Sequence, residues 1–320
     1  MSAAVKPVLS SFAQDVAEGL SREQKQISSQ YFYDDLGSAL FEAITLLPEY
    51  GLTRADERLL QAHARHIAAA AGPVETVCEL GSGSGKKTRY ILEALREQQQ
   101  NLVYRPIDVS AAALEVCQKE VADLAQVRPV CADWMDGLRE ISRSCYHAPL
   151  LLLFLGSSIG NLERAAIPEF LTQMRANLRP GDLFLIGFDL VKDLETMLNA
   201  YDDATGVTAA FNLNLLNRIN RELDADFDLR AFAHEAIWNS EQRRIEMHLL
   251  SGREQTVSVG ALEMPFRFEA GETIWTESSH KFLESELTEL AYSGGFHPVR
   301  VWTDRLWPFA EALWSVRPPS

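Results

Sequence analysis

The sequence has few cysteines, and none of them forms a closely spaced pair. The four thiols are Cys78, Cys117, Cys131 and Cys145. Because no C-x-x-C spacing occurs, zinc-ribbon and thioredoxin-like sites are excluded. No metal site is predicted, and buried, reduced thiols in a cytoplasmic protein are expected.

Long apolar runs are also missing. The longest extends from Pro149 to Leu155, which is far too short to cross a bilayer. The first twenty residues carry Asp15 and Glu18 and lack the apolar region of a signal peptide. We therefore expect a soluble, intracellular protein with no membrane partner.

Positive charge is scarce in this chain. Lys and Arg total 30 against 45 Asp and Glu, which gives a formal net charge of −15. Since an acidic surface repels phosphate backbones and anionic lipids, nucleic-acid and membrane-surface partners are disfavoured. The 320 residues, 47% hydrophobic and 23% charged, are typical of a globular protein with about two domains.

The middle third alternates strand and helix patterns. Strands are predicted over 76–80, 102–107, 127–131, 150–155 and 183–188, with helices over 88–97, 110–124 and 167–178 between them. The run at 150–155 is entirely apolar, as in a central parallel strand covered on both faces. This alternation predicts an α/β fold with a doubly wound sheet.

The pattern changes after Val191. Residues 193–227 are mostly helical in pattern, and strands with period-two alternation follow at 243–251, 255–259 and 273–281. A helix over 284–293 and strands over 298–303 and 313–316 end the chain. We expect a core of residues 57–191 completed by 286–320, and a second, α+β lobe of residues 1–56 and 192–285.

A glycine-rich loop follows the first strand of the core. It extends from Glu79 to Thr88 and contains Gly81 and Gly83. A Walker A loop fails because Lys87 stands where Ser or Thr is required, and a dinucleotide fingerprint is incomplete at Lys86. The E-L-G-x-G-x-G pattern resembles motif I of the class I methyltransferases that use S-adenosyl-L-methionine (SAM). A purely structural turn is the alternative.

Acidic residues end the next two strands. An acid at the position of Asp108 can accept both ribose hydroxyls of a nucleoside, although it can equally cap the following helix. Asp133 and Trp134 stand where an acid and an aromatic ring would contact adenine, but Trp134 can also be a core residue. The stretch from Asn177 to Asp182, which precedes a strand, resembles the L-x-P-G-G turn of the class I methyltransferases. Strand ends of this kind meet at one edge of the sheet.

Longer stretches resemble the histidine-specific Nα-methyltransferases of ergothioneine biosynthesis. The resemblance runs from about residue 28 to the C-terminus, in matching order. It is carried by the stretches 31–41, 47–50, 154–161, 189–193, 200–212, 243–247 and 276–279.

This resemblance implies a class I Rossmann-like SAM-methyltransferase fold with an inserted α+β substrate-binding lobe. It implies that SAM methylates the α-amine of L-histidine three times, which yields hercynine. The implied substrate residues are Tyr33 beside the amine, Asn161 and Tyr201 at the carboxylate, Tyr50 lining the pocket, and Glu277 and Ser279 at the imidazole. The implied SAM residues are Gly81, Gly83, Lys87, Asp108, Asp133 and Trp134.

Other functions stay open at this point. The enzyme could methylate the α-amine of another amino acid such as tryptophan, although Glu277 disfavours an indole. It could also be a non-catalytic module that binds SAM or an amino acid, whereas a dehydrogenase is disfavoured by Lys86. Each tyrosine could simply pack, Glu277 could face solvent, and Asn161 could cap a helix. A monomer is expected.

Overall fold

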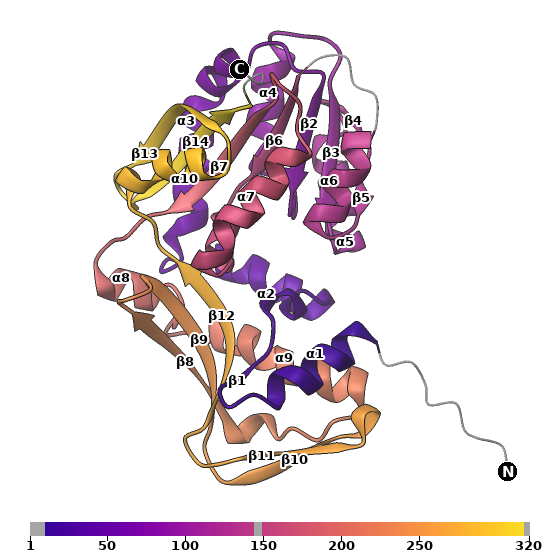
Figure 1. Cartoon of the computed structure of the whole chain (residues 1–320), viewed down its shortest axis with the longest axis vertical. Helices are drawn as coiled ribbons and strands as arrows, with labels where there is room; N and C mark the ends of the chain where they lie inside the picture. The colour runs from indigo at the N-terminus through magenta and orange to yellow at the C-terminus, as the bar shows by residue number, and fades with distance from the viewer. Residues whose placement is uncertain (1–9, 144–148, 317–320) are drawn as a thin grey trace, which may run out of the picture. The chain divides into compact units, whose positions relative to one another are not determined.

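The computed structural model describes residues 10–143 and 149–316, which fold into two compact units (Figure 1). Unit 1 combines the described residues up to Tyr50 with Leu194–Ser279. Unit 2 combines Gly51–Asp193 with the described residues from His280 onward. These limits lie a few residues from the expected limits after residues 56, 191 and 285. Cys145 and the expected domain ends at 1–9 and 317–320 lie outside the described residues.

Unit 2 is an α/β unit with an eight-stranded sheet. The strand order is β13-β14-β7-β6-β2-β3-β4, and β5 also pairs with β3. Its strands are β2 (Thr76–Leu80), β3 (Val103–Asp108), β4 (Gln126–Val127), β5 (Val130–Cys131), β6 (Leu150–Phe154), β7 (Leu183–Asp189), β13 (His297–Asp304) and β14 (Phe309–Ser315). Its helices are α3 (Gly51–Ala71), α4 (Thr88–Arg96), α5 (Ala111–Val121), α6 (Trp134–Arg143), η2 (Ser158–Asn161), η3 (Arg164–Ala166), α7 (Ile167–Ala176), η6 (Glu284–Glu286) and α10 (Leu287–Ser293).

The order of the parallel strands defines where a ligand would bind. Strand β2 pairs in parallel with β3 on one side and with β6 on the other, and β6 pairs in parallel with β7. The chain therefore proceeds outward from β2 and then returns to its other side, so a topological switch point lies between β2 and β6. Open α/β sheets bind ligands outside the carboxyl ends of strands at such a point.

The central strands of the sheet have the burial that their apolar sequences predict. Every residue of β2, β6 and β7 is buried, as expected for strands covered by helices on both faces. In Figure 1, α7 lies in front of the sheet near β6, whereas α10 lies in front of the β14 side of the sheet and α3 lies behind that side. The Ser110 hydroxyl accepts a hydrogen bond from the Ala113 N–H at 3.2 Å and so caps α5.

One expected strand is divided in two. Residues 127–131 form no continuous strand, because β4 and β5 are two-residue strands that pair with β3 at separate places. The expectation of a single strand was wrong here. Arg128 and Pro129 interrupt the run, and proline cannot donate a ladder hydrogen bond.

Unit 1 contains two antiparallel strand pairs and a long helix. Its four-stranded sheet has the order β1-β12-β9-β8, and β10 and β11 form a separate hairpin. Its strands are β1 (Lys25–Gln26), β8 (Phe232–Asn239), β9 (Arg244–Ser251), β10 (Gln255–Val259), β11 (Met264–Phe268) and β12 (Thr273–His280). Its helices are α1 (Ser11–Leu20), η1 (Ser29–Phe32), α2 (Asp35–Thr45), α8 (Leu194–Asn199), α9 (Val207–Leu223), η4 (Leu229–Ala231) and η5 (Gly260–Leu262).

The two-residue strand β1 was not predicted, and neither were the longer strands β8 and β11. Strand β8 contains Ala233, His234, Glu235 and Ala236, which are residue types with low strand preference, and it is fixed by pairing with β9. Strand β11 contains Pro265 at its second position and sits in a two-stranded hairpin. Both depend on their partners for their conformation.

The helical stretch of unit 1 is interrupted at Asp203. Its carboxylate accepts hydrogen bonds from the Thr208 and Val207 N–H groups at 2.7 and 3.1 Å, and from the Thr205 hydroxyl. Burial opposes its ionisation, but these donors prevail and lower the pKa of Asp203. The side chain therefore ends the turn after α8 and starts α9.

The cysteines and the longer helices bear on two further expectations. The described cysteines are free; Cys78 and Cys117 are buried, whereas Cys131 is exposed. The prediction of buried thiols was therefore wrong for Cys131. No helix of the described ranges combines the length and apolarity needed to cross a membrane.

Candidate active site

The glycine loop between β2 and α4 adopts a left-handed backbone at three positions. Gly81, Gly83 and Gly85 have φ values of 68°, 50° and 74°. Side chains are strained in this region, so the loop requires glycine and leaves its backbone open to a ligand. The loop therefore fits the predicted SAM contacts at Gly81 and Gly83.

Asp108 connects the end of β3 to this loop. One carboxylate oxygen accepts the Gly83 N–H at 3.1 Å, and the other accepts the Ser110 N–H at 2.9 Å. Because Ser110 caps α5, Asp108 is not needed for that task. A carboxylate can accept about four hydrogen bonds, so Asp108 keeps the capacity to accept ribose hydroxyls.

Asp133 and Trp134 follow β5. The exposed Asp133 accepts the Asp136 N–H at 2.9 Å and so stabilises the start of α6. The Trp134 ring meets Phe154 edge-on at 4.8 Å, and its Nε1 lies 3.4 Å from where a Cβ of Gly81 would stand. Trp134 is thus half-buried against the core and also adjoins the glycine loop. Both uses that the sequence left open are compatible with its position.

Lys87, the last predicted cofactor residue, is paired within the protein. Its ammonium group contacts the Asp56 carboxylate of α3, and Asp56 is fully buried. The Lys87 side chain keeps 26% of its surface exposed. Burial would lower the pKa of Lys87, but Asp56, Glu311 and Glu79 prevail and raise it. Lys87 is thus a cation held in place by Asp56 at the end of the glycine loop.

The predicted substrate tyrosines belong to one aromatic cluster of unit 1. The Tyr33 ring meets Phe41 at 5.6 Å, Phe41 meets Tyr50 at 6.4 Å, and Tyr50 meets Tyr201 at 6.0 Å. All three contacts are edge-on, which is a favourable arrangement of aromatic quadrupoles. The structure thus brings Tyr33, Tyr50 and Tyr201 together from three separate segments.

Strand β12 adds the residues predicted to recognise a side chain. The hydroxyl groups of Tyr201 and Ser279 are 2.6 Å apart in a buried hydrogen bond. Glu277 lies two residues before Ser279, so strand alternation directs both side chains to the same face. Five of the six predicted substrate residues therefore lie in unit 1.

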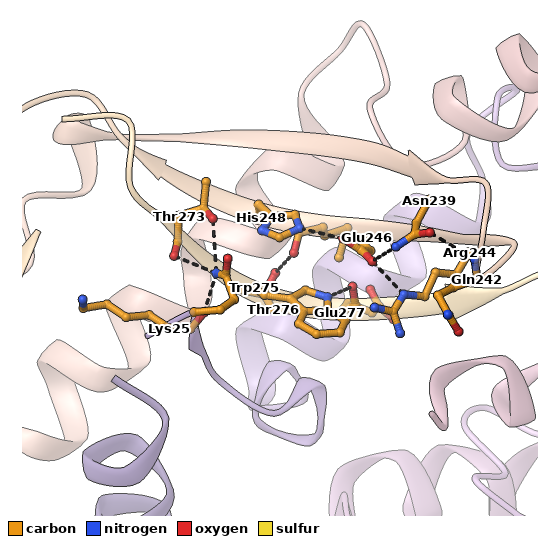
Figure 2. A network of polar contacts seen from close by, with 12 residues as sticks. Lys25, Asn239, Gln242, Arg244, Glu246, His248, Thr273, Trp275, Thr276 and Glu277 are labelled. Atoms are coloured by element: carbon orange, nitrogen blue, oxygen red, sulfur yellow. Dashed lines mark hydrogen bonds and ion pairs between the residues drawn. The ribbon is translucent and has the colours of Figure 1, made fainter. Parts of the chain in front are cut away.

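The neighbouring strand β9 supports this part of β12 (Figure 2). The Arg244 guanidinium lies 4.4 Å from the Trp275 ring centroid, and its Nε donates to Glu246 at 2.7 Å. The Trp275 Nε1–H in turn donates to the backbone carbonyl of Glu277 at 2.9 Å. These contacts explain the Arg244–Glu246 stretch that was part of the sequence resemblance.

Two positioning residues were missed by the sequence reasoning. His234 Nε2 lies 2.7 Å from the carbonyl oxygen of Tyr201, so Nε2 carries the proton and Nδ1 accepts from Asn212. Asn212 also accepts the Thr276 hydroxyl at 2.8 Å. Together they link Tyr201 to β12. Asn212 lay within a matching stretch, whereas no sequence signal singled out His234.

Asn161 is the substrate residue placed in unit 2. It ends the short helix η2, which follows β6 through Ser157 in a left-handed conformation (φ 60°). The Ser157 hydroxyl accepts the N–H of Asp189 at 2.8 Å, which ties this strained turn to the end of β7. A non-glycine residue in this conformation is uncommon and favours a functional turn.

The groups that the predicted site residues offer to ligands are hydrogen-bond donors and acceptors and one cation. Within the described ranges, no group of three or more His, Cys, Asp and Glu side chains could hold a metal ion. Unit 2 offers a backbone cradle, a carboxylate and a lysine, as a nucleoside carrying an amino acid would need. Unit 1 offers phenol, hydroxyl and carboxylate groups, as a small zwitterion with a hydrogen-bonding side chain would need.

Comparisons with known proteins support this chemistry. A family model described as "Histidine-specific methyltransferase, SAM-dependent" matches residues 12–316. Histidine N-alpha-methyltransferase from Mycobacterium tuberculosis is 43% identical over 93% of both chains. Ergothioneine biosynthesis protein 1 from Neurospora crassa is 30% identical over 87% of this chain and 32% of its own length.

A solved structure supports the fold. A Thermobifida fusca protein described as a candidate methyltransferase aligns with a TM-score of 0.50 at 13% identity, over 94% of this chain and 98% of its own. The expected Rossmann-like class I fold is confirmed. With the family model matched over nearly the whole chain, the protein belongs to the histidine-specific, SAM-dependent methyltransferase family.

Proposed function

We propose that the protein transfers three methyl groups from SAM to the α-amine of L-histidine and so forms hercynine, a step of ergothioneine biosynthesis. The observation that best supports histidine as the substrate is the Tyr201–Ser279 hydrogen bond at 2.6 Å, with Glu277 two residues before Ser279 on β12. A carboxylate and a hydroxyl on one strand face can read both imidazole nitrogens, because one accepts an N–H and the other donates.

We propose that unit 1 binds the amino acid and unit 2 binds SAM. Bound SAM would supply an electrophilic methyl group on its sulfonium centre, and cleavage of the sulfur–methyl bond would leave the thioether S-adenosylhomocysteine. Tyr201 and Asn161 would hold the substrate carboxylate, while Tyr50 lines the pocket. The α-amine is largely protonated at neutral pH, so it must lose a proton before each transfer. Tyr33, with its edge-on partner Phe41, would orient the amine, and orientation supplies much of the rate of such displacements.

An assay with each of the twenty amino acids tests this function. Purified protein is incubated with SAM, and products are weighed by mass spectrometry. Histidine should gain mass in methyl increments, and tryptophan should not. A gain on tryptophan alone would favour the alternative α-N-methyltransferase, and SAM binding by calorimetry with no product from any amino acid would favour a binding module.

Location and assembly are part of the same proposal. The cytoplasmic location and the monomeric state both stay predictions. Light scattering of the purified protein tests the assembly, since a monomer should give a mass close to the 35.8 kDa of one chain.

A further inference from the structure

Three carboxyl groups and one lysine are enclosed together in unit 2. Asp56 lies on α3, Glu79 on β2 and Glu311 on β14, with exposures of 0%, 3% and 0%. Lys87, at the start of α4, is the cation among them, and each of the three carboxyl groups acts on its charge. If every group were ionised, two negative charges would stay uncompensated in the interior. Such a state is strongly disfavoured, so buried carboxyl groups take up protons instead.

Hydrogen-bond donors are distributed unequally over these carboxyl groups. Glu79 accepts the Thr88 hydroxyl at 2.6 Å and also the Tyr104 hydroxyl. Asp56 Oδ2 accepts the Gly156 N–H at 3.0 Å and the Lys87 ammonium. Neither oxygen of Glu311 receives a hydrogen bond from the described residues, nor does Asp56 Oδ1. Glu311 is thus the carboxyl group with the least support for a negative charge.

The neighbouring strand is built to accommodate the Glu311 side chain. Residue 187 on β7 pairs with Glu311 and is glycine. A Cβ at this position would stand 2.9 Å from Glu311 Oε1 and 3.2 Å from the Gly156 nitrogen. The absence of a side chain at Gly187 therefore lets the carboxyl group approach the turn after β6, where Asp56 binds.

We propose that Glu311 is protonated in the folded protein and donates its proton to Asp56 Oδ1, so that both act as positioning residues for the Lys87 ammonium group. Burial raises the pKa of Glu311 well above its usual range, and its charge and hydrogen-bond interactions with Asp56 raise it further. Burial likewise raises the pKa of Glu79 to about 7, although Thr88, Tyr104 and Lys87 oppose this.

The shared proton leaves Asp56 singly charged and directed at Lys87. The Lys87 ammonium group is thereby held on the enclosed Asp56 carboxylate, while 26% of the lysine side chain stays exposed. This arrangement would let a cofactor carboxylate approach Lys87 without meeting a second free negative charge. That consequence rests on the proposed binding of SAM, whereas the protonation of Glu311 does not.

The pH dependence distinguishes a protonated from an ionised Glu311. A carboxyl group whose pKa is raised by folding costs stability as the pH rises from its unfolded value, 4.5, toward its folded value. Glu311→Gln keeps the shape and the donor but needs no proton. The variant should therefore gain stability over the wild type between pH 6 and pH 8, by a melting-temperature difference of about 2 °C or more. Glu289→Gln, at an exposed helix position, is the control and should show no such gain.

An ion pair between Glu311 and Lys87 would give the opposite result. In that case Glu311→Gln would lose stability at both pH values, and the proposal would be wrong. Infrared spectra of the wild type provide a measurement that does not depend on the variant folding. At pH 8, above the titration of Glu79, the carbonyl stretch of a protonated carboxyl group should persist, and its absence would equally overturn the proposal.

Binding of S-adenosylhomocysteine separates this proposal from the proposed function. Calorimetry should give Glu311→Gln an affinity within about twofold of the wild type, whereas Asp56→Asn should lose about tenfold or more. Equal losses in both variants would contradict the positioning role. If the wild type binds no S-adenosylhomocysteine, the proposed function fails, while the stability and infrared results still decide the protonation of Glu311.

Discussion

At the scale of single residues, the structure shows that predicted site residues are oriented by hydrogen-bond partners that the sequence did not reveal. Tyr201 is predictable as a substrate residue from its matching stretch, but its orientation depends on Ser279 at 2.6 Å and on His234 at its carbonyl. These partners lie 78 and 33 residues away in the chain. Local sequence carries no information on such contacts, which arise only when the strands pair.

Glu277 is expected to select histidine. Glu277→Gln removes the negative charge that would accept an imidazole N–H, and hydrogen bonds to charged groups contribute about 1.5–3 kcal/mol. The KM for histidine should rise about tenfold to a hundredfold, while the affinity for S-adenosylhomocysteine stays within about twofold. Steady-state kinetics and calorimetry measure both. Glu269→Gln, exposed and outside the cluster, is the matched control; identical kinetics in the two variants would count against a role for Glu277 in recognition.

At the scale of elements, strands with an apolar sequence pattern could be predicted. Strands that have no such pattern, and whose conformation depends on pairing, could not. The apolar residues of β6 define a central strand by themselves. Strand β8, with Ala, His and Glu in its middle, and the two short strands β4 and β5 are determined by their partners. The glycine loop lies between these cases: its position follows from sequence, whereas its contact with Cys117 of α5 does not.

Because of that contact, a side chain is tolerated less well at Gly85 than at other glycines with a left-handed backbone. A Cβ at Gly85 would stand 2.7 Å from Cys117 Sγ, while Gly72 has a similar φ of 69° with no atom within 4 Å. Gly72→Ala should cost only the backbone strain, about 1–2 kcal/mol of unfolding free energy. Gly85→Ala should cost more and also weaken binding of S-adenosylhomocysteine.

Urea denaturation and calorimetry of the two glycine variants test this difference. The denaturation midpoint of Gly72→Ala should fall modestly, with cofactor affinity unchanged. Equal losses of stability in the two variants, with unchanged affinity in both, would show that the contact with Cys117 does not hold the loop.

At the scale of the whole molecule, the chain leaves unit 2 after Asp193 and returns at His280. Asp189 joins the two chain segments at these points, because its carboxylate contacts Lys192 at 2.6 Å and Lys281 at 2.8 Å. The backbone of Phe282 pairs with Asp189 and Val191 beside them. The unit boundaries expected from the sequence differ from these by a few residues, because a cluster of buried charges has no recognisable local sequence pattern.

Asp189 should stabilise the fold in a pH-dependent way. Burial opposes its ionisation, but Lys281 and Lys192 prevail and lower the pKa of Asp189 below its usual 3.8. The stabilisation is therefore present above about pH 4 and is lost as the pH falls through the lower folded value. Asp189→Asn removes the carboxylate that the buried Lys192 and Lys281 both contact and should cost about 3–5 kcal/mol at pH 7.

Urea unfolding of Asp189→Asn and the wild type at pH 7 and pH 3 measures this. The difference in unfolding free energy between the variant and the wild type should be smaller at pH 3 than at pH 7. A difference that is the same at both pH values would mean that the contribution of Asp189 does not depend on its charge.

The proposed reaction is tested most directly by the structure of the product. Histidine is incubated with SAM that carries a ¹³C-labelled methyl group, and the product is examined by NMR. Three equivalent methyl groups on the α-nitrogen, with an unmodified imidazole ring, are predicted. Label on a ring nitrogen, or no label on histidine at all, would contradict the proposal.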